Sequence, residues 1–365
     1  MDYVTIGLWI IVGLVVIFTA VPMLRVSHGF VRSADFPRQQ VLMVAVGTMI
    51  VIAIVRPQNE WWMIGLLALS VLNHAIYIGR YLPIWHSQSV RPRVQEAVEP
   101  GQTISLIAAN VKKSNRDYAR LVQLARETNA DILMALETDA EWVEGLSILA
   151  DSYPHAMTQP YDNGYGMAVY SKYPLEEASF RELVVEKVPS LRTRVTLPSG
   201  EAFRLYVVHP EPPVPYQDTE GRDAELGAIG LEVKDDPLPA IVTGDLNDVA
   251  WSITTRRFQK VSGLLDPRVG RGFYNTFSAR SWLMRWPLDH LFHDPRFRLI
   301  EMRRLKDIKS DHFPMYFKLL LTHRDDADSV PDKADSEELS EVRDMIKREK
   351  NSDREAIGSD WEDED

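Results

Sequence analysis

The hydrophobic and polar positions divide the chain into stretches with different patterns. Residues 1–82 are almost entirely apolar, residues 103–321 alternate short apolar runs with amphipathic segments, and residues 322–365 are dominated by charge. Alternating strand-like and helix-like segments are typical of domains built from packed layers. The pattern therefore predicts a membrane segment, a folded domain and a charged tail, with residues 83–102 as a linker before the domain.

The amino-terminal stretch contains three apolar runs, at residues 4–24, 41–55 and 61–79. The first run holds no charged residue and is long enough to cross a bilayer. A cleaved signal peptide is the competing interpretation, but no basic segment precedes the run and two more runs follow it. We therefore expect residues 1–82 to form a three-helix membrane anchor that contacts the lipid bilayer through residues 4–79.

Arginines beside these runs indicate how the chain is oriented. Three lie in the first loop and three follow the third run, whereas the second loop holds only Arg56 beside Glu60. The six arginines are Arg25, Arg32, Arg38, Arg80, Arg91 and Arg93. By the positive-inside tendency, both arginine-rich segments and the folded domain are expected in the cytoplasm.

The folded domain is expected to begin with two strand–helix units. The first combines a strand at 103–109 with a helix at 118–128, and the second a strand at 131–136 with a helix at 140–150. The other expected elements are a helix at 219–233 and strands at 166–171, 192–197, 202–208, 240–242, 288–292 and 315–321. A short turn with Gly200 separates two of these strands, which predicts an antiparallel hairpin.

A polar residue stands at the end of several of these strands. Asn110 and Glu137 end the first two, His209 follows the strand at 202–208, and Asp245 and Asn247 follow the one at 240–242. Because Asp245 and Asn247 are two positions apart, both side chains lie on one side if the chain stays extended. This spacing suits a site that handles a metal-bound water and a phosphate group.

Two more carboxylates stand beside a histidine, Asp289 next to His290 and Asp311 next to His312. Any one of these strand-end residues can equally be a turn or helix-capping residue. Several such positions in one domain, all drawn from Asn, Asp, Glu and His, favour a shared functional site.

Composition excludes some classes of function. The chain has 365 residues, of which 45% are hydrophobic and 25% charged, enough for one large domain with accessory segments. Its formal net charge of -11 gives no support for a broad basic surface that binds nucleic acid. Cysteine is absent, which excludes disulfides, thiolate metal sites and a cysteine nucleophile.

Taken in order, the polar motifs resemble the endonuclease/exonuclease/phosphatase (DNase I-like) superfamily, which includes nucleases, inositol polyphosphate phosphatases and bacterial sphingomyelinases. The resemblance extends over residues 103–321. The motifs that carry it are Asn110, Glu137, Tyr165–Ser171, His209, Gly244–Asn247, Asp289–His290 and Ser310–His312. It implies an α/β (α+β) four-layer sandwich of two packed mixed β-sheets flanked by helices, here preceded by three transmembrane helices. Membrane-anchored bacterial members share this layout, so the resemblance also implies the bacterial inner membrane.

The resemblance also implies roles for individual residues. Asn110, Glu137 and Asp311 would hold Mg²⁺ or Mn²⁺, with Glu137 as the principal ligand, and all three supply the oxygen donors that these ions prefer. The implied catalytic residues are His209, Asp245, Asn247, Asp289 and His312. Which of the two histidines acts as the general base is left open.

We therefore expect a membrane-anchored, divalent-metal-dependent phosphoesterase that hydrolyses a phosphodiester or phosphomonoester by in-line attack of an activated water. The substrate could be a lipid, a sugar phosphate or a nucleic acid, so a metal-dependent endo/exonuclease is one alternative. A non-catalytic, membrane-tethered binding module on the same fold is another, although the complete set of site residues favours an enzyme. No protein partner is predicted. The charged tail at 322–365 is expected to be disordered, with a solvated helix at 338–350 as an alternative for that part.

Overall fold

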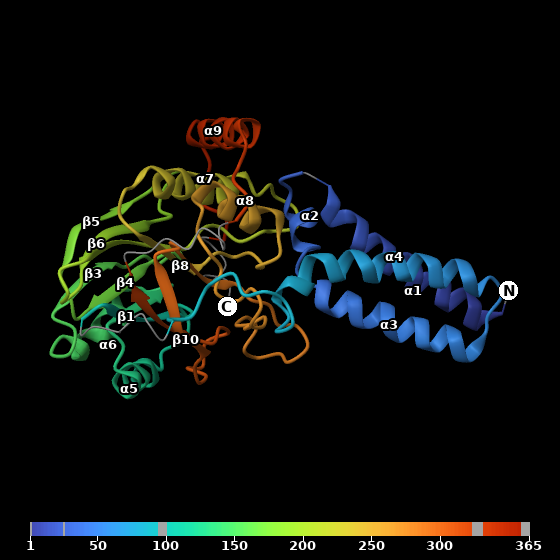
Figure 1. Ribbon diagram of the computed structural model, residues 1–365, viewed down its shortest axis with the longest axis horizontal. Helices are drawn as coiled ribbons and strands as arrows, with labels where there is room; N and C mark the ends of the chain where they lie inside the picture. The colour runs from blue at the N-terminus through green and yellow to red at the C-terminus, as the bar shows by residue number, and fades with distance from the viewer. Residues whose placement is uncertain (1, 25, 94–100, 323–330, 359–365) are drawn as a thin grey trace.

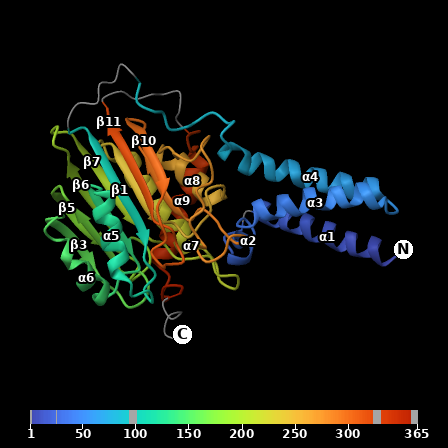
Figure 2. The same ribbon diagram turned by 90° about the horizontal axis from the view of Figure 1, so that it is seen from below.

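The computed structural model describes residues 2–24, 26–93, 101–322 and 331–358. A bundle of three long helices and a layered domain lie end to end along the long axis of the molecule, with the N-terminus at the far end of the bundle (Figure 1). Figure 2 shows the same bundle projecting from one side of the domain.

The bundle consists of α1 (Tyr3–Ala20), α3 (Arg38–Val55) and α4 (Glu60–Ile78), with the short helix α2 (Gly29–Ser33) at its domain end. Apolar side chains such as Leu8, Val12, Ala45 and Leu67 pack between the long helices. Their outer surfaces also carry exposed apolar side chains. All three are long and apolar enough to cross a membrane, which agrees with the three runs predicted from the sequence.

The domain is built on two β-sheets. The first has the strand order β10-β11-β1-β2-β4-β3 and the second the order β5-β6-β7-β8-β9. The strands of the first sheet are β1 (Thr103–Asn110), β2 (Ile132–Leu136), β3 (His155–Gln159), β4 (Met167–Ser171), β10 (Phe297–Arg304) and β11 (Met315–Leu321). The strands of the second sheet are β5 (Leu175–Arg181), β6 (Ser190–Thr196), β7 (Ala202–Val208), β8 (Ala240–Asp245) and β9 (Asp289–His293).

Both sheets are mixed, because β1 pairs with β2 and β7 with β8 in parallel while the other pairs are antiparallel. Their facing sides bury one apolar core. The helices α5 (Tyr118–Thr128) and α6 (Ala140–Leu146) cover the outer face of the first sheet, and α7 (Glu220–Asp235) and α8 (Ile253–Ser262) that of the second (Figure 1). The expected four-layer sandwich is therefore confirmed.

The bundle and the domain are in direct contact at the end of the bundle. The Tyr81 hydroxyl donates to the Ala250 carbonyl at 2.6 Å, and the Trp251 indole donates to the Asp35 carbonyl at 2.8 Å. The backbone of α2 approaches the domain so closely that a Cβ at Gly29 would lie 1.6 Å from the Val214 carbonyl oxygen. Only glycine fits this position.

The described part of the expected linker is not a free tether. The Ser89 hydroxyl lies 2.6 Å from His293 Nε2, and the Gln88 side chain accepts from the Asp266 backbone N–H at 2.8 Å. Residues 83–93 therefore run along the domain, because the polar groups of this stretch find partners there. Residues 94–100 lie outside the described residues.

The expectation of a disordered tail is wrong for residues 331–358, which include the helix α9 (Ser336–Lys350). Asp335 and Glu338 form a capping box at its start, and Val342 is buried beside Gly227 of α7. The tail beyond α9 also has a partner in the domain, Glu211. The remaining tail residues, 323–330 and 359–365, lie outside the described residues.

Glu211 explains why this tail is ordered. Its carboxylate is 1% exposed and accepts two hydrogen bonds from Arg354, both at 2.7 Å, and one from the Ile357 backbone N–H at 2.7 Å. A buried carboxylate is costly without a charged partner. Arg354 of the tail supplies that partner, so part of the charge of the tail is paired with a buried group of the domain.

Candidate functional site

The first two predicted site residues meet at one edge of the first sheet. Asn110 is the last residue of β1, and Glu137 directly follows β2. Because β1 and β2 are parallel and adjacent, their carboxyl ends lie together. The Asn110 Nδ2 atom donates to Glu137 Oε1 at 2.6 Å.

The second sheet brings its own strand ends to the same place. Asp245 ends β8, and Asn110 Nδ2 lies 3.0 Å from its Oδ2 atom, which joins the two sheets across the site. β7 runs parallel to β8 with Val208 opposite Gly244, so His209 lies beside Asp245. On the other side of β8, Asp289 of β9 is in register with Asp245.

His312 lies between two carboxylates. Its Nδ1 atom is 2.8 Å from Asp289 Oδ2, and its Nε2 atom is 3.4 Å from Asp245 Oδ2. Burial alone would lower the pKa of this imidazole, but the Asp289 and Asp245 carboxylates outweigh burial and raise the pKa of His312 to about 10. His312 is therefore held as an imidazolium at neutral pH.

His209 has the opposite environment. It is buried with its ring 5.4 Å from the Tyr165 ring, and its Nδ1 atom has no hydrogen-bond partner among the described residues. Burial lowers the pKa of His209 to about 4, although Asp245 acts in the opposite direction. At neutral pH this imidazole is neutral, and one ring nitrogen stays available to a ligand.

Tight backbone turns position the carboxylate and amide side chains of the site. Gly244 has φ 142°, and a Cβ there would lie 1.9 Å from the Val208 carbonyl oxygen, so glycine is required where β7 and β8 approach the site. Glu137 and Asn247 adopt left-handed φ values of 63° and 49°. Such values are uncommon for residues other than glycine and cluster at functional sites.

Asn247 is fixed by two hydrogen bonds. Its backbone N–H donates to Asp245 Oδ1 at 2.9 Å, and its side-chain amide donates to the Pro210 carbonyl at 2.9 Å. These bonds hold Asp245 and the loop after His209 in one arrangement.

Glu137 is the group best suited to a cation. Burial raises the pKa of Glu137 to about 8; the hydrogen bond from Asn110 lowers it, and the nearby Asp311 carboxylate raises it. Within the described residues no ion pair is found for Glu137, the charge of His312 only partly offsets its burial, and its second oxygen accepts the Lys113 backbone N–H at 3.3 Å. A bound divalent cation would supply the missing positive charge, so the residues present fit such an ion.

The other two predicted ligands are held differently. Asn110 Oδ1 accepts from the Lys112 backbone N–H at 3.0 Å, and Asp311 lies 3.4 Å from the Lys112 ammonium group. Within the described residues, Asp245, Asp289 and His312 also place one possible ligand atom each within 4.8 Å of one another. Both nitrogens of His312 already face carboxylates, and an imidazolium cannot bind a metal, so this trio is better explained as a charged hydrogen-bond network.

A protein-family model matches the part of the chain that carries the site residues. A model described as the Endonuclease/Exonuclease/phosphatase family matches residues 107–312, more than half of the chain. The chain belongs to this family. A comparison with curated proteins gives no match.

Solved structures of the endonuclease/exonuclease/phosphatase family share the fold. A structure of D. rerio TDP2 humanized by 14 mutations has a TM-score of 0.50 and 19% identity, covering 60% of this chain and 99% of that one. D. rerio TDP2 complexed with single strand DNA product has a TM-score of 0.51 and 18% identity, covering 60% and 98%. The human Nocturnin catalytic domain with bound sulfate has a TM-score of 0.50 and 15% identity, covering 62% and 97%. These likenesses support the fold.

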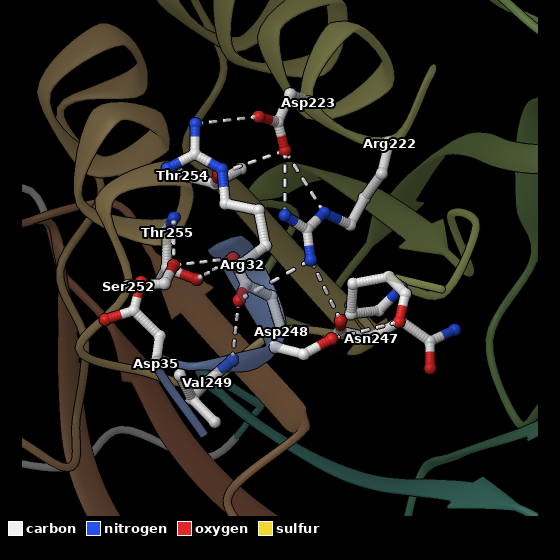
Figure 3. A network of polar contacts seen from close by, with 12 residues as sticks. Arg32, Asp35, Arg222, Asp223, Asn247, Asp248, Val249, Ser252, Thr254 and Thr255 are labelled. Atoms are coloured by element: carbon white, nitrogen blue, oxygen red, sulfur yellow. Dashed lines mark hydrogen bonds and ion pairs between the residues drawn. The ribbon is translucent and has the colours of Figure 1, made fainter. Parts of the chain in front are cut away.

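A buried ionic cluster behind Asn247 was not predicted. We call it the anchor network, and Figure 3 shows it. Arg222 of α7 donates to the Asn247 carbonyl at 3.2 Å and pairs with Asp223 at 3.0 Å and with Asp248 at 3.6 Å. Arg32 of α2 approaches Asp223 at 3.5 Å. The helical bundle is thus linked through charged side chains to the loop that carries Asn247.

A second charged residue of the bundle, Asp35, lies in the same region. Asp35 follows α2, and its carboxylate pairs with Arg38 at 2.7 Å. Burial raises the pKa of Asp35 to about 6, an effect that the positive charge of Arg38 partly offsets. No sequence signal identifies these residues, because a charged residue buried with a partner has the same letter as one on a surface.

Proposed function

We propose that this protein is a membrane-anchored, divalent-metal-dependent phosphoesterase. The observation that carries the proposal is the amide of Asn110, which bridges Glu137 of one sheet edge and Asp245 of the other at 2.6 and 3.0 Å. That bridge places a carboxylate suited to a cation beside the carboxylate–imidazolium pair of Asp245 and His312. Family membership supports the same reaction class, since members of this family are phosphoesterase and nuclease hydrolases.

Each side chain has a role that its contacts support. Glu137, with Asn110 and Asp311, would hold Mg²⁺ or Mn²⁺, which when bound offsets negative charge on the phosphate oxygens. Asp245 is oriented by the Asn247 backbone and can align the attacking water and accept its proton.

The two histidines complete the site. The Nδ1 atom of His312 is hydrogen-bonded to Asp289, while its Nε2–H, which forms only a 3.4 Å ion pair with Asp245, can donate to a phosphate oxygen as negative charge develops there. His209 presents a neutral imidazole from the other side of Asp245. With Asn247, these groups form the proposed catalytic set.

We further propose that α1, α3 and α4 cross a bacterial inner membrane, with residues 103–321 as the catalytic domain on the cytoplasmic side. The apolar surfaces of the three helices support the first part. The arginines at the domain end of the bundle support the second.

A panel of substrates tests the proposed reaction. We expect the purified full-length protein to hydrolyse bis-p-nitrophenyl phosphate or p-nitrophenyl phosphate in the presence of Mg²⁺. Hydrolysis should stop when EDTA removes the metal and resume when excess Mg²⁺ is added. Release of p-nitrophenol is the readout.

The panel also separates the alternatives. A single-stranded oligonucleotide belongs in it because one similar structure, that of D. rerio TDP2, contains a single strand DNA product. Cleavage of the oligonucleotide alone would favour a nuclease. A protein that is inert towards every phosphoester would favour a non-catalytic binding module.

A further inference from the structure

A loop beside the site exposes a continuous apolar tip. Residues 278–285, which we call the apolar loop, carry Trp282, Leu283 and Met284 at exposed fractions of 86%, 47% and 47%. Isolated exposed apolar side chains are ordinary on soluble domains, but three large ones in succession indicate a surface that meets something apolar.

The tip of the apolar loop lies at the start of α3. Gln40 in the first turn of α3 donates to the Leu283 carbonyl at 2.6 Å. Asn275, just before the loop, donates to the Gln39 side chain at 3.0 Å. Figure 1 shows this orange loop beside the domain end of α3.

This position is also where the apolar surface of the bundle begins. Phe30 in α2 is 58% exposed, and Met43, one turn into α3, is 59% exposed. If α3 crosses a bilayer, Trp282 is level with the boundary between headgroups and acyl chains. Tryptophan favours that boundary, because its ring is apolar and its indole N–H remains in reach of water.

The base of the same loop contacts the proposed catalytic residues. The Phe277 ring lies 4.9 Å from the His312 ring, and the Ala279 backbone N–H donates to the Asp311 carbonyl at 2.6 Å. Phe277 also stacks on Trp286, whose ring meets Phe36 of the anchor edge-on at 5.5 Å. One short segment therefore links the site to the domain end of the bundle.

Two guanidinium groups lie close to the residue after His312, that of Arg285 at the end of the apolar loop and that of Arg304 at the end of β10. Arg285 and Arg304 stand over the Phe313 ring, at 5.0 and 4.4 Å from its centroid, and Phe313 directly follows His312. Their hydrogen bonds go to backbone carbonyls, those of Ser278 and Ala279 for Arg285 and that of Asn275 for Arg304. Among the described residues, no carboxylate pairs with either arginine. This pair is complementary to an anionic phosphate group.

We propose that the substrate is an anionic lipid of the host bilayer with a phosphoester headgroup. Its headgroup is bound by Arg285 and Arg304, and its acyl chains stay in the bilayer beside the apolar loop. This inference rests on the proposed function. Water forms a new bond to phosphorus, the ester phosphorus–oxygen bond breaks, and one proton passes to the leaving oxygen while the other stays with the phosphate product or solvent.

A hydrolysis assay on bilayers tests the substrate class. Full-length protein in phosphatidylcholine nanodiscs is offered phosphatidylglycerol, phosphatidylinositol or phosphatidic acid, with bis-p-nitrophenyl phosphate measured in the same samples. We expect turnover of at least one anionic lipid. Changing Trp282→Ser, Leu283→Ser and Met284→Ser together should lower the ratio of lipid to bis-p-nitrophenyl phosphate turnover at least tenfold.

Matched variants sharpen that assay. Ile148→Ser, which removes another exposed apolar side chain on the far side of the domain, should leave both rates within twofold of wild type. Arg285→Gln with Arg304→Gln should reduce the preference for anionic lipid over phosphatidylcholine. Hydrolysis of bis-p-nitrophenyl phosphate or oligonucleotide without any lipid turnover would overturn the lipid proposal and leave the phosphoesterase proposal standing.

A measurement without turnover tests the position of the loop. The chain has no cysteine, so Trp282→Cys or Ile148→Cys gives a single site for an environment-sensitive fluorophore. We expect nitroxide-labelled lipids in the nanodisc to quench the fluorophore at position 282 strongly and the one at position 148 hardly at all. Equal quenching at the two positions would overturn the membrane placement of the loop, whether or not the protein proves to be an enzyme.

Discussion

The two histidines of the candidate site have pKa values that their surroundings shift in opposite directions. Burial lowers the pKa of His209 more than the nearby Asp245 raises it, so this imidazole stays neutral, whereas His312 lies between Asp289 and Asp245 and stays charged. The carboxylate of Asp289, 2.8 Å away, is the main source of that charge stabilisation. Neighbouring titratable groups whose pKa values are shifted in opposite directions are a common feature of sites that carry out acid–base chemistry.

Asp289→Asn tests this arrangement. With one carboxylate lost, the pKa of His312 falls from about 10 towards its ordinary value, so the imidazolium is lost as the pH rises through neutrality. We expect kcat for bis-p-nitrophenyl phosphate to fall about 100-fold at neutral pH. The alkaline limb of the kcat–pH profile should also move to lower pH. A variant that keeps the wild-type alkaline limb would show that Asp289 does not set the charge of His312.

The sequence indicates that these residues lie close together because they stand beside strand ends. Asn110, Glu137 and Asp245 are far apart in the chain, but each lies at the carboxyl end of a strand that has a parallel neighbour. His312 joins them because it lies just before β11, which runs antiparallel to β1. Arg222 could not be found in the same way, because it lies within a helix and its contacts with Asp248 and the Asn247 carbonyl come from a distant segment. The contacts that fix the Asn247 loop depend on tertiary packing that local patterns do not encode.

At the level of helices and strands, the sequence predicts the bounds of buried strands and amphipathic helices most closely. The helix at 118–128 and the strands at 202–208 and 315–321 have the bounds of α5, β7 and β11. β3 and β5 were missed, since both are half-buried strands at sheet edges, without the clear apolar alternation of a central strand. The helix α8 and the strand β10 were also not expected.

The tail shows how one buried partner can order a charged segment. Arg354→Gln would leave the Glu211 carboxylate buried without its charged partner, so we expect the free energy of unfolding to fall by about 3 kcal/mol. Arg348→Gln is the matched control, since the Arg348–Glu220 pair is exposed and its loss should cost at most about 0.5 kcal/mol. Chemical denaturation of the full chain in detergent measures both. Equal effects of the two changes would mean that the tail contributes nothing specific to the domain.

At the scale of the whole molecule, the helical bundle and the domain form one packed unit. Arg32 and Asp35 of the anchor reach buried groups of the domain, and the same network holds the Asn247 carbonyl through Arg222 (Figure 3). Charge in the first loop therefore has a structural use in addition to any role in membrane orientation. The sequence indicated the three parts of the chain but not the contacts between them, since those depend on how separate segments meet in space.

The side of the membrane on which the folded domain lies is a prediction at the scale of the whole molecule. A fluorescent reporter that folds only in the cytoplasm, fused to the carboxyl terminus of the full chain, should be bright in a bacterial host. Alkaline phosphatase at the same position, which folds only outside the cytoplasm, should be inactive. The reverse pattern would place the domain outside the cytoplasm, contrary to the distribution of arginines.

The most direct test of the central claim is a titration of the EDTA-treated, full-length protein with Mn²⁺. Bound metal, followed by electron paramagnetic resonance, and the rate of bis-p-nitrophenyl phosphate hydrolysis are read from the same samples. We expect the rate to rise with occupancy of one site. In Glu137→Gln the affinity for Mn²⁺ should fall at least tenfold and the rate by about 1000-fold, whereas the control Glu141→Gln, an exposed change on α6, should behave as wild type. Hydrolysis that does not depend on Mn²⁺, or that survives Glu137→Gln, would contradict a metal-dependent site at this sheet edge.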